Sequence, residues 1–543
     1  MRVALAQINS VVGDLEGNAA RIEQFYRRAV QAGADIVVYP ELCLCGYPPE
    51  DLLHKRHFLE DNLSALKALA KNCTGPVAVV GFAELAADTC YNSAAVIQAG
   101  EIPQIYRKGL LPNYGVFDES RYFATGNQPV TLPVADLKTV VTICRDIWDV
   151  DWLKSFLAQV RPFAIIVNLS SSPFHVGKIK IRQTVVSDCA ISFGCAICYC
   201  NLVGGQDELV FDGRSMIADS SGRIRAKAKA FEEDLLLADI ELADEQVNVS
   251  PVGAPAPQVS DPVEEVYQAL VLGTRDYVRK NGFARVLLGL SGGIDSSVVA
   301  AIAAAALGKE NVTGITMPSR FNVKQTKSDA AKLAKNLGIE FLTIPIEKTL
   351  EQFDKTLATA KGWNNEGIAY ENLQARIRGS VLMSLSNQSG ALVLTTGNKS
   401  ETAVGYSTLY GDTAGGFAVI KDVPKTLVYK LAKYINAKAG KQIIPQTVIE
   451  RPPTAELRAG QKDSDSLPDY DLLDRILEGY VEQDLSARQL IESGLPKEEV
   501  LRTVEMVDRN EYKRRQSPPG IKITPKAFGK DRRLPITNQY KTK

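Results

Sequence analysis

The sequence predicts an α/β protein with two unlike domains, and three observations support this prediction. In the first half, apolar runs of strand length alternate with segments whose apolar residues recur at helical spacing. A proline-rich segment at residues 247–262 then separates this half from a buried strand that ends in a glycine turn. All nine cysteines of the 543-residue chain lie within its first 200 residues, as expected if the two parts differ.

The overall composition excludes some general classes of partner. The 63 basic side chains balance 63 acidic ones, so we expect no electrostatic binding of nucleic acid or of an anionic membrane. The longest apolar run, residues 298–307, is too short to span a bilayer. No charged and apolar leader precedes Asn9, and the odd number of cysteines argues against a disulfide framework. We therefore expect a cytoplasmic protein with reduced thiols.

The first half begins with an expected strand at residues 3–8 and a helix over residues 17–32. Strands that alternate with helices are typical either of two packed sheets with helices outside or of one doubly wound sheet. In such folds, functional groups gather where strands end. The further strands are expected at residues 34–39, 77–83, 93–98, 140–144, 164–168 and 196–202.

Three strand ends carry reactive side chains. Glu41 follows residues 37–40, Lys108 follows residues 105–107, and Cys144 ends the strand that begins at residue 140. A lysine lowers the pKa of a neighbouring thiol, and a carboxylate can take the thiol proton and deliver it to an amine leaving group. The set could therefore supply a base, an oxyanion stabiliser and a nucleophile. The alternative is a buried core thiol with two surface charges, since cysteine is commonly buried.

Longer motifs around these positions favour the catalytic interpretation. Residues 1–246 resemble the glutaminase branch of the nitrilase superfamily, which implies an α-β-β-α sandwich. The resemblance makes Glu41 the general base, Lys108 the oxyanion-stabilising lysine and Cys144 the nucleophile. Arg145 departs from the acidic residue that the family commonly has after the nucleophile, so the orientation of the substrate is open there. The motifs lie at residues 39–47, 106–119, 143–148, 168–178 and 201–213, and the positions that match the glutamine pocket are Tyr114, Ser171 and Lys178.

The remaining cysteines allow a second interpretation. Cys195, Cys198 and Cys200 have a spacing that could belong to half a zinc site or to a redox pair. No second CxxC pair and no histidine cluster complete such a site, and the segment is apolar and strand-like. We therefore expect buried strand cysteines, and we expect Cys43 and Cys45 to pack behind Glu41.

The border between the halves is a predicted linker over residues 247–262, which contains four prolines. A helix is expected to begin at Asp261 and Pro262, a capping residue followed by proline at the first helical position. This helix should end near Asn281, with acidic residues early and basic residues late, as the helix dipole prefers.

The strongest phosphate-binding signal follows this helix. An apolar strand at residues 285–290 leads into the glycine turn at residues 291–297 and an alanine-rich helix. Backbone N–H groups at such a turn converge on an anion, and the helix N-terminus adds partial positive charge. The alternative is a helix packed closely on a strand without a ligand. A hydrolase elbow, G-x-S-x-G, is excluded because it requires a histidine downstream, and the histidines His54, His57 and His175 all lie upstream.

The Ser-Gly-Gly-x-Asp-Ser turn resembles the loop of ATP-pyrophosphatases, and residues 263–520 resemble NAD synthetases. Together, the two halves resemble the glutamine-dependent NAD synthetases. The basic segment at residues 521–543 would then be a surface tail or a subunit contact, and residues 459–471 a mobile lid or an ordinary solvated loop. The supporting motifs lie at residues 370–378, 395–401, 410–416, 452–457 and 511–516.

This resemblance implies a reaction and a set of ligands. ATP would activate nicotinic acid adenine dinucleotide as an acyl-adenylate, and ammonia would displace AMP. Asp295 and Glu401 match the positions that hold Mg²⁺. The assignment of Lys425 as an ATP contact is open, because Lys421 is nearby and could take that place. The alternative is that both lysines belong to the exposed basic start of a helix. The implied ATP contacts are Gly289, Leu290, Ser291, Gly292, Gly293, Ile294, Asp295, Ser296, Ser297, Thr396, Lys425 and Thr454, and the implied dinucleotide contacts are Asn372, Arg376, Glu401 and Lys513.

The two halves imply a partnership in which ammonia from glutamine is used by the second site. Free ammonia is mostly protonated at neutral pH, so we expect a sheltered transfer. The resemblance also implies a dimer or higher homo-oligomer. Two alternatives remain open: an ATP-pyrophosphatase amidotransferase with another acid substrate, and a carbon–nitrogen hydrolase with a nucleotide-sensing module.

Overall fold

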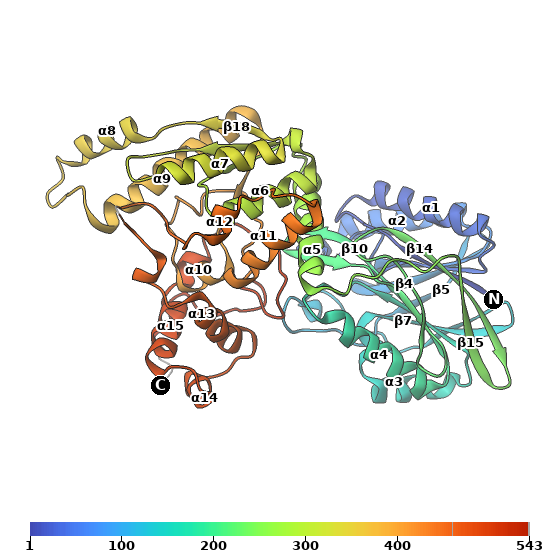
Figure 1. Cartoon of the computed structure of the whole chain (residues 1–543). Helices are drawn as coiled ribbons and strands as arrows, with labels where there is room; N and C mark the ends of the chain where they lie inside the picture. Colours follow the sequence, from blue (N-terminus) through green and yellow to red (C-terminus); the bar gives the residue numbers. More distant parts are fainter. Residues whose placement is uncertain (459, 541–543) are drawn as a thin grey trace. The chain divides into compact units, whose positions relative to one another are not determined.

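The computed structural model describes residues 1–458 and 460–540, and the chain forms two compact units, Met1–Ser260 and Asp261–Lys543. Figure 1 shows the elements of both. Ala459 of the predicted lid and residues 541–543 of the predicted tail lie outside the described residues. Within the described part, no helix is both long and apolar enough to cross a membrane.

The first unit contains two large sheets and a short ribbon. One sheet has the strand order β15-β14-β1-β2-β3-β4-β5, the other has β13-β12-β9-β8-β7-β6, and β10 pairs with β11. The strands are β1 (Arg2–Gln7), β2 (Ile36–Val38), β3 (Val77–Ala86), β4 (Thr89–Gln98), β5 (Glu101–Arg107), β6 (Val130–Val134), β7 (Leu137–Ile143), β8 (Ile165–Ser170), β9 (Ala196–Asn201), β10 (Val203–Gln206), β11 (Leu209–Asp212), β12 (Met216–Ala218), β13 (Ile224–Lys227), β14 (Asp234–Ala243) and β15 (Gln246–Val252).

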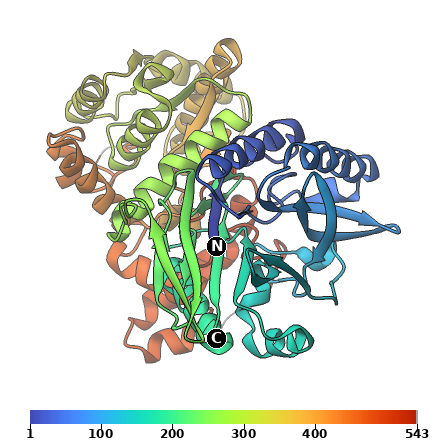
Figure 2. The same ribbon diagram turned by 90° about the vertical axis from the view of Figure 1, so that its right-hand side faces the viewer.

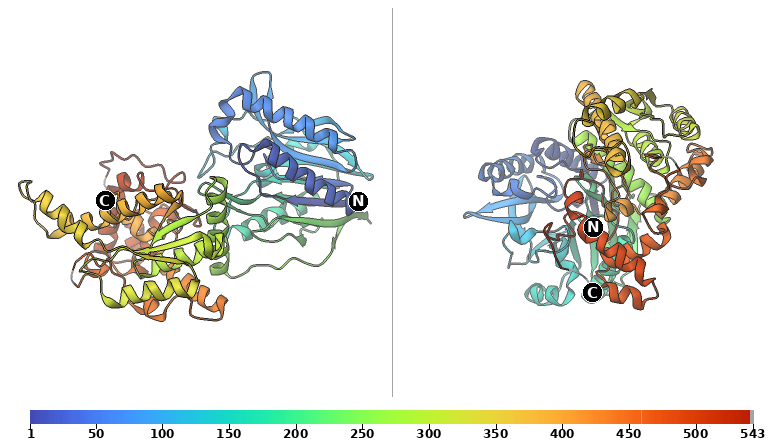
Figure 3. Two further views of the ribbon diagram at one scale, coloured as in Figure 1. Left: turned by 90° about the horizontal axis from the view of Figure 1, so that it is seen from above. Right: turned by 90° about the vertical axis from the view of Figure 1, so that its left-hand side faces the viewer.

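Helices cover the outer face of each sheet. Helices α1 (Leu15–Gln31) and α2 (Arg56–Asn72) pack on the first sheet, and α3 (Val150–Phe156) and α4 (Lys178–Phe193) pack on the second (Figure 2, Figure 3). The alternation of strand side chains builds these layers. Val3 and Leu5 of β1 point into the core between the sheets, whereas Ala4 and Ala6 pack toward α1 and α2. The predicted α-β-β-α sandwich is confirmed.

The second unit is built on an all-parallel sheet with the order β18-β17-β16-β19-β20. The order reverses between β16 and β19, which is the switch point where doubly wound folds bind ligands. Leu287 packs against α9, while α6 and α7 contact the sheet through other residues. The predicted doubly wound fold is confirmed. The strands are β16 (Val286–Gly289), β17 (Val312–Thr316), β18 (Glu340–Thr343), β19 (Leu392–Thr395) and β20 (Phe417–Ala418).

The helices of the second unit extend beyond this sheet. Helices α13, α14 and α15 form a smaller cluster with its own apolar core, which includes Leu473, Leu490 and Val504. The helices are α5 (Pro262–Lys280), α6 (Ile294–Leu307), α7 (Lys324–Leu337), α8 (Glu347–Leu357), α9 (Gly367–Ser389), α10 (Lys399–Val404), α11 (Lys425–Ala439), α12 (Gln446–Glu450), α13 (Tyr470–Leu477), α14 (Ala487–Glu492), α15 (Lys497–Arg509) and α16 (Glu511–Arg514).

Part of the segment predicted as an extended linker belongs to the first sheet. Residues 247–252 lie in β15, which pairs antiparallel with β14. Val247 and Val249 alternate into the core between the sheets, and this apolar alternation overrides the proline-rich composition. Only residues 253–261 remain outside regular structure before α5 begins.

Residues 521–532 of the predicted tail are packed into the fold, so a simple surface tail is a wrong description of this part. Ile521 and Ile523 are fully buried, and Lys522 makes an ion pair with Asp531. Asp422 accepts hydrogen bonds from the backbone N–H of Ile523 at 2.8 Å and of Thr524 at 2.7 Å. The alternating residues Ile521 and Ile523 give this segment a buried face, although its many basic residues had suggested an exposed segment.

The segment predicted as a lid or a solvated loop contains a short 3-10 helix at Asp463–Asp465. Asp463 is buried and accepts a hydrogen bond from the Tyr470 hydroxyl at 2.9 Å and one from Tyr406 at 3.3 Å. A buried carboxylate with two donors anchors this part of the segment to the unit.

Candidate active sites

Cys144 directly follows β7 and opens a short 3-10 helix, Cys144–Trp148. Its backbone has φ +41°, a conformation that non-glycine residues adopt rarely and that is found at functional turns. The side chain is 6% exposed. Burial and the charge of Glu41 raise the pKa of the Cys144 thiol to about 12, against the opposing charge of Lys108. The thiol is therefore protonated at neutral pH, and its use as a nucleophile requires a base.

Lys108, the residue after β5, is fully buried between two carboxylates. Its Nζ lies 2.6 Å from Oε1 of Glu41, and 2.9 Å and 2.7 Å from the two oxygens of Glu119. Burial opposes the positive charge, but Glu119 and Glu41 outweigh it and raise the pKa of Lys108. A buried ammonium is stable only when it is paired and hydrogen-bonded in this way. Lys108 is therefore a permanent cation of the site.

Glu119 is a functional residue that sequence reasoning missed. Its Oε1 also accepts a hydrogen bond from the Tyr47 hydroxyl at 3.1 Å. Burial raises the pKa of Glu119 to about 7. The negative charge of Glu41 also raises it, whereas the positive charge of Lys108 lowers it. A signal was present, because Glu119 ends the matched motif that begins before Lys108. Its role became visible only when the loop after β5 folded back onto Lys108.

Glu41 is held in place by donors from several elements. Its Oε1 also accepts from Nδ2 of Asn92 in β4 at 2.8 Å, and its Oε2 accepts from the backbone N–H of Ser171 at 3.0 Å. The Ser171 hydroxyl donates to the Glu41 carbonyl at 2.9 Å. The structure thus brings Glu41, Lys108 and Ser171 together, and the charges of Glu41 and Lys108 act on the pKa of Cys144.

Asp146 ties the Cys144 turn to the loop that carries Lys108. One oxygen accepts from the Ile143 N–H at 2.8 Å and from the Tyr106 hydroxyl at 2.7 Å. The other accepts from the Leu110 N–H at 2.9 Å. Burial raises the pKa of Asp146 to about 6. This network sets the relative position of two strand ends.

A rim of aromatic and cationic side chains lies next to Cys144. The Arg145 guanidinium donates to the Tyr114 hydroxyl at 3.2 Å and lies 5.4 Å from the centre of the Tyr114 ring. Nζ of Lys178 lies 4.4 Å from the centre of the Trp148 ring. Tyr114 is 52% exposed. The rim therefore offers two cations to an incoming ligand, which suits a carboxylate.

The glycine turn of the second unit joins β16 to α6. Gly292 has φ +81°, and a Cβ there would lie 2.2 Å from the backbone oxygen of Thr326, so only glycine fits. The Ser291 hydroxyl accepts from the Gly293 N–H at 3.1 Å, and the Ser297 hydroxyl donates to the Gly293 carbonyl at 2.7 Å. These bonds hold the turn open at the N-terminus of α6, where an anion is favoured.

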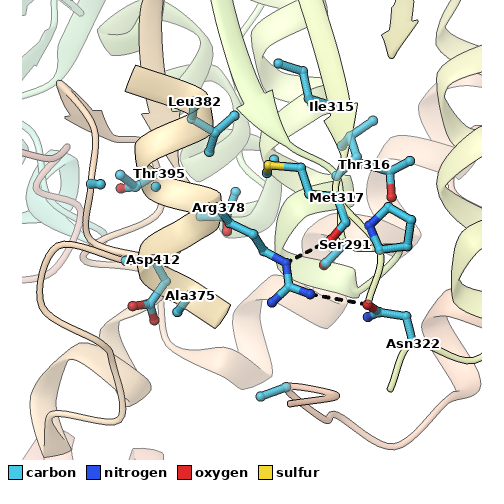
Figure 4. Close-up of a pocket in the computed structure, with 18 of the residues that line it drawn as sticks. Ser291, Ile315, Thr316, Met317, Asn322, Ala375, Arg378, Leu382, Thr395 and Asp412 are labelled. Atoms are coloured by element: carbon cyan, nitrogen blue, oxygen red, sulfur yellow. Dashed lines mark hydrogen bonds between the residues drawn. The ribbon is translucent and has the colours of Figure 1, made fainter. Parts of the chain in front are cut away.

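Two neighbouring cavities lie at the carboxyl ends of the parallel strands. The larger, about 260 Å³, is drawn in Figure 4, and the smaller, about 50 Å³, lies along the glycine turn. The predicted ATP contacts that line the larger are Gly289, Leu290, Ser291 and Thr396, and those that line the smaller are Ser291, Gly292, Gly293, Ile294 and Thr454. Ser296 lies one turn into α6, where its hydroxyl donates to the Gly293 carbonyl at 3.1 Å.

Lys425 connects the two predicted magnesium-binding carboxylates. Its Nζ lies 2.5 Å from Oδ2 of Asp295 and 2.9 Å from Oε1 of Glu401, and the side chain is 2% exposed. The alternative of an exposed basic helix start is therefore wrong for Lys425. Burial raises the pKa of Glu401 to about 7. The positive charge of Lys425 lowers this pKa, whereas the negative charge of Asp295 raises it further. Each carboxylate needs a cation in this buried setting.

The donor set suits magnesium. Asp295 and Glu401 provide carboxylate oxygens, the ligand type that Mg²⁺ prefers, and Mg²⁺ takes only one or two protein carboxylates when phosphates complete its shell. The Asn398 amide donates to Oδ1 of Asp295 at 3.0 Å and its oxygen accepts from the Glu401 N–H at 2.9 Å, which keeps the pair aligned. Among the described residues, no group of three histidine, cysteine or acidic side chains could hold a metal ion without further ligands.

Three predicted dinucleotide contacts surround one loop. Asn372 accepts a hydrogen bond from the Thr408 hydroxyl at 2.7 Å, and Arg376 donates to the Leu409 carbonyl at 3.2 Å. Nζ of Lys513 donates to the carbonyl of Gly405 at 2.7 Å. Burial lowers the pKa of Lys513. Side chains from α9 and α16 thus converge on residues 405–409, whereas Glu401 lies at the Lys425 cluster.

The cysteines with metal-like spacing lie in or next to a buried strand. Cys198 and Cys200 are in β9, Cys195 immediately precedes it, and all three are fully buried. Burial raises the pKa of each of these thiols. They pack against the cores of the first unit.

Comparisons with known proteins match both units. A carbon–nitrogen hydrolase family model matches residues 2–247, and an NAD synthase family model matches residues 266–517. The glutamine-dependent NAD(+) synthetase of Thermotoga maritima is 47% identical over 572 residues, covering 100% of this chain and 99% of that protein. The structure of glutamine-dependent NAD+ synthetase from Acinetobacter baumannii in complex with ADP is 42% identical, with a TM-score of 0.79 over 100% of this chain and 99% of that one.

A second solved structure, from Cytophaga hutchinsonii, shares the fold at 24% identity, with a TM-score of 0.84 over 99% of this chain and 98% of that one. The two units thus occur together in relatives that this chain matches over nearly their whole length. The chain belongs to the glutamine-dependent NAD(+) synthetases.

Proposed function

We propose that this ligase releases ammonia from glutamine at Cys144 and uses it to amidate ATP-activated nicotinic acid adenine dinucleotide, with NAD, AMP and diphosphate as products. The observation that carries the proposal is the presence, in one chain, of a buried Glu41–Lys108–Glu119 cluster coupled to Cys144 and of a phosphate-type turn beside the Asp295–Lys425–Glu401 cluster. Full-length similarity to relatives named for this activity supports it.

In the first site, Glu41 accepts the Cys144 proton as the sulfur attacks the carboxamide carbon of glutamine. Lys108, a permanent cation, stabilises the negative oxygen of the tetrahedral intermediate. Glu41 then delivers the proton to the departing ammonia, and water hydrolyses the thioester. Glu119 keeps Lys108 charged and oriented while Glu41 changes protonation state.

In the second site, the carboxylate of the dinucleotide attacks the α-phosphorus of ATP, and diphosphate leaves toward the turn at residues 291–297. Ammonia then attacks the acyl-adenylate, and AMP departs. Asp295 and Glu401 are the residues that would hold Mg²⁺, which offsets phosphate charge when bound. Lys425 adds a second cation at the same place, and Asn372, Arg376 and Lys513 orient the dinucleotide.

Arg145 is expected to recognise the α-carboxylate of glutamine together with Lys178. Replacing Arg145 by glutamine should raise the KM for glutamine about 10- to 100-fold with little change in kcat, because one charge-assisted hydrogen bond is lost in ground and transition states alike. The measurement is glutamate release at increasing glutamine concentration.

The control for Arg145 is a substrate analogue, 4-aminobutanamide, which lacks the α-carboxylate. Its KM should be the same for the wild-type enzyme and the Arg145→Gln variant. An equal rise of KM for both amides would contradict carboxylate recognition by Arg145.

We also propose a cytoplasmic homo-oligomer. The nine cysteines are all free thiols, which suits a reducing compartment. Ile368 and Tyr410 of the synthetase unit are 76% and 66% exposed, and a subunit contact would remove their apolar surface from water. Sedimentation of the purified enzyme, compared with an Ile368→Glu variant, tests the assembly.

Diphosphate release tests the proposed function. ATP and nicotinic acid adenine dinucleotide should give diphosphate and NAD with either glutamine or ammonium. Release with another acid instead would indicate a different amidotransferase. Glutamine hydrolysis without any diphosphate would indicate a hydrolase with a nucleotide-sensing module.

Ammonia released from glutamine is expected to be used before it mixes with solution. An external enzyme that consumes free ammonia should then leave glutamine-driven NAD formation within about twofold of its rate, while it stops ammonium-driven formation. Strong loss of the glutamine-driven reaction would contradict sheltered transfer.

A further inference from the structure

Arg378 of α9 lies in the wall of the larger cavity of the synthetase unit and was not among the predicted site residues. Figure 4 shows its side chain reaching from α9 toward the end of β17. Its Nε donates to the Met317 carbonyl at 3.0 Å, and Nη2 donates to Oδ1 of Asn322 at 3.3 Å. The guanidinium is therefore held at the edge of the space between these elements.

The charge of Arg378 is not matched by a direct acidic partner. Within residues 1–458 and 460–540, no carboxylate forms an ion pair with it, and its two hydrogen-bond partners are neutral. The nearest compensation is indirect, since Asn322 donates to Oε2 of Glu456 at 3.0 Å. Burial lowers the pKa of Arg378 to about 10. Keeping a half-buried cation without a paired anion is unfavourable, so its presence at the cavity wall indicates an anionic ligand in the cavity.

The position of Arg378 indicates which anion this is. Asn322 and Thr326 line both the larger cavity and the smaller one along the glycine turn, and Arg378 contacts Asn322 directly. A nucleoside in the larger cavity with diphosphate on the turn would place the α-phosphate at this junction.

We propose that Arg378 binds the α-phosphate of ATP and stabilises it through adenylation. This inference rests on the proposed function. As the carboxylate oxygen forms its bond to the α-phosphorus, the bond to the bridging oxygen of diphosphate breaks and its electron pair leaves with diphosphate. Negative charge stays on the α-phosphate oxygens, and a guanidinium N–H group donates to them. Arg378 contacts the same phosphate in the acyl-adenylate and in AMP.

The test compares adenosine with AMP and ATP on the full-length enzyme. The Arg378→Gln variant should bind adenosine within about twofold of the wild type but AMP and ATP about 10- to 100-fold more weakly. Ammonium-driven NAD synthesis should lose kcat by about 10²- to 10³-fold, as when one donor to a developing oxyanion is removed. Arg378→Lys keeps the positive charge but loses the planar guanidinium fork. Its affinity for AMP and ATP and its kcat should lie between those of the wild type and of Arg378→Gln.

Arg509→Gln is the matched control, because Arg509 is 75% exposed and pairs with Glu505 on α15, away from the cavity. It should bind all three ligands as the wild type does. Equal losses of adenosine and AMP affinity in Arg378→Gln would assign Arg378 a purely structural role, and no loss would also overturn the inference. If Arg378→Gln does not fold, the same comparison in Arg378→Lys decides. A wild-type enzyme that forms no NAD from ammonium would instead refute the proposed function.

Discussion

Replacing Cys144 by alanine is expected to abolish NAD formation from glutamine while leaving NAD formation from ammonium intact. Loss of the nucleophile removes the thioester route entirely, so the glutamine-driven rate should fall about 10⁴-fold or more. Ammonium enters after this step and does not need the thiol. The ratio of the two rates, measured on the same preparation, separates the chemistry of the two sites.

Cys90→Ala is the matched control for this experiment. Cys90 lies in β4, outside the Glu41–Lys108–Glu119 cluster, and is only half-buried. It should retain both activities. If Cys144→Ala lost ammonium-driven synthesis as well, the assignment of separate roles to the two units would be contradicted.

Replacing Glu401 by glutamine is expected to stop NAD formation from both nitrogen sources. The change removes one of the two carboxylates that bind Lys425 and that would hold Mg²⁺, so the transition state for adenylation loses its cation. The rate should fall about 10²- to 10³-fold by analogy with the loss of one electrostatic contact in other enzymes. Hydrolysis of glutamine to glutamate should survive, because its residues belong to the other unit.

The control for Glu401 is Glu505→Gln on the exposed face of α15, where the carboxylate is 58% exposed. A melting temperature close to that of the wild type would show that Glu401→Gln keeps its fold. A variant that lost only glutamine-driven synthesis would contradict the role of Glu401 in adenylation. Dependence of the residual rate on Mg²⁺ concentration provides a second readout.

Much of both sites could be predicted from local sequence signals. Glu41, Lys108 and Cys144 each stand at the end of an expected strand, and the ends of neighbouring strands meet in an α/β fold. The turn at residues 291–297 requires glycine for its backbone and lies between an apolar strand and an apolar helix. Such signals depend on residues within one or two elements, so they can be interpreted without knowledge of the whole chain.

The partners that neutralise the buried charges could not be predicted from local sequence signals. Glu119 and Lys425 are buried charged residues in segments that also contain exposed charges, and their neighbours along the chain do not show which groups compensate their charges. Their partners come from distant segments, such as Glu41 for Lys108 and Asp295 for Lys425. The energetics of a buried charge depend on what surrounds it in space, and this is set by packing.

What the sequence determined and what only the tertiary structure determined therefore differ for a physical reason. Periodic apolar residues and glycine turns in the sequence predicted the two α/β domains and the phosphate turn, because backbone conformation and side-chain alternation are local properties. The choice of Cys144 as nucleophile came from the family resemblance of the longer motifs. Packing revealed β15 within the predicted linker, the buried segment at residues 521–532 and the ion clusters around Lys108 and Lys425. These features depend on contacts between residues that are far apart in the chain, and such contacts exist only once the elements have assembled.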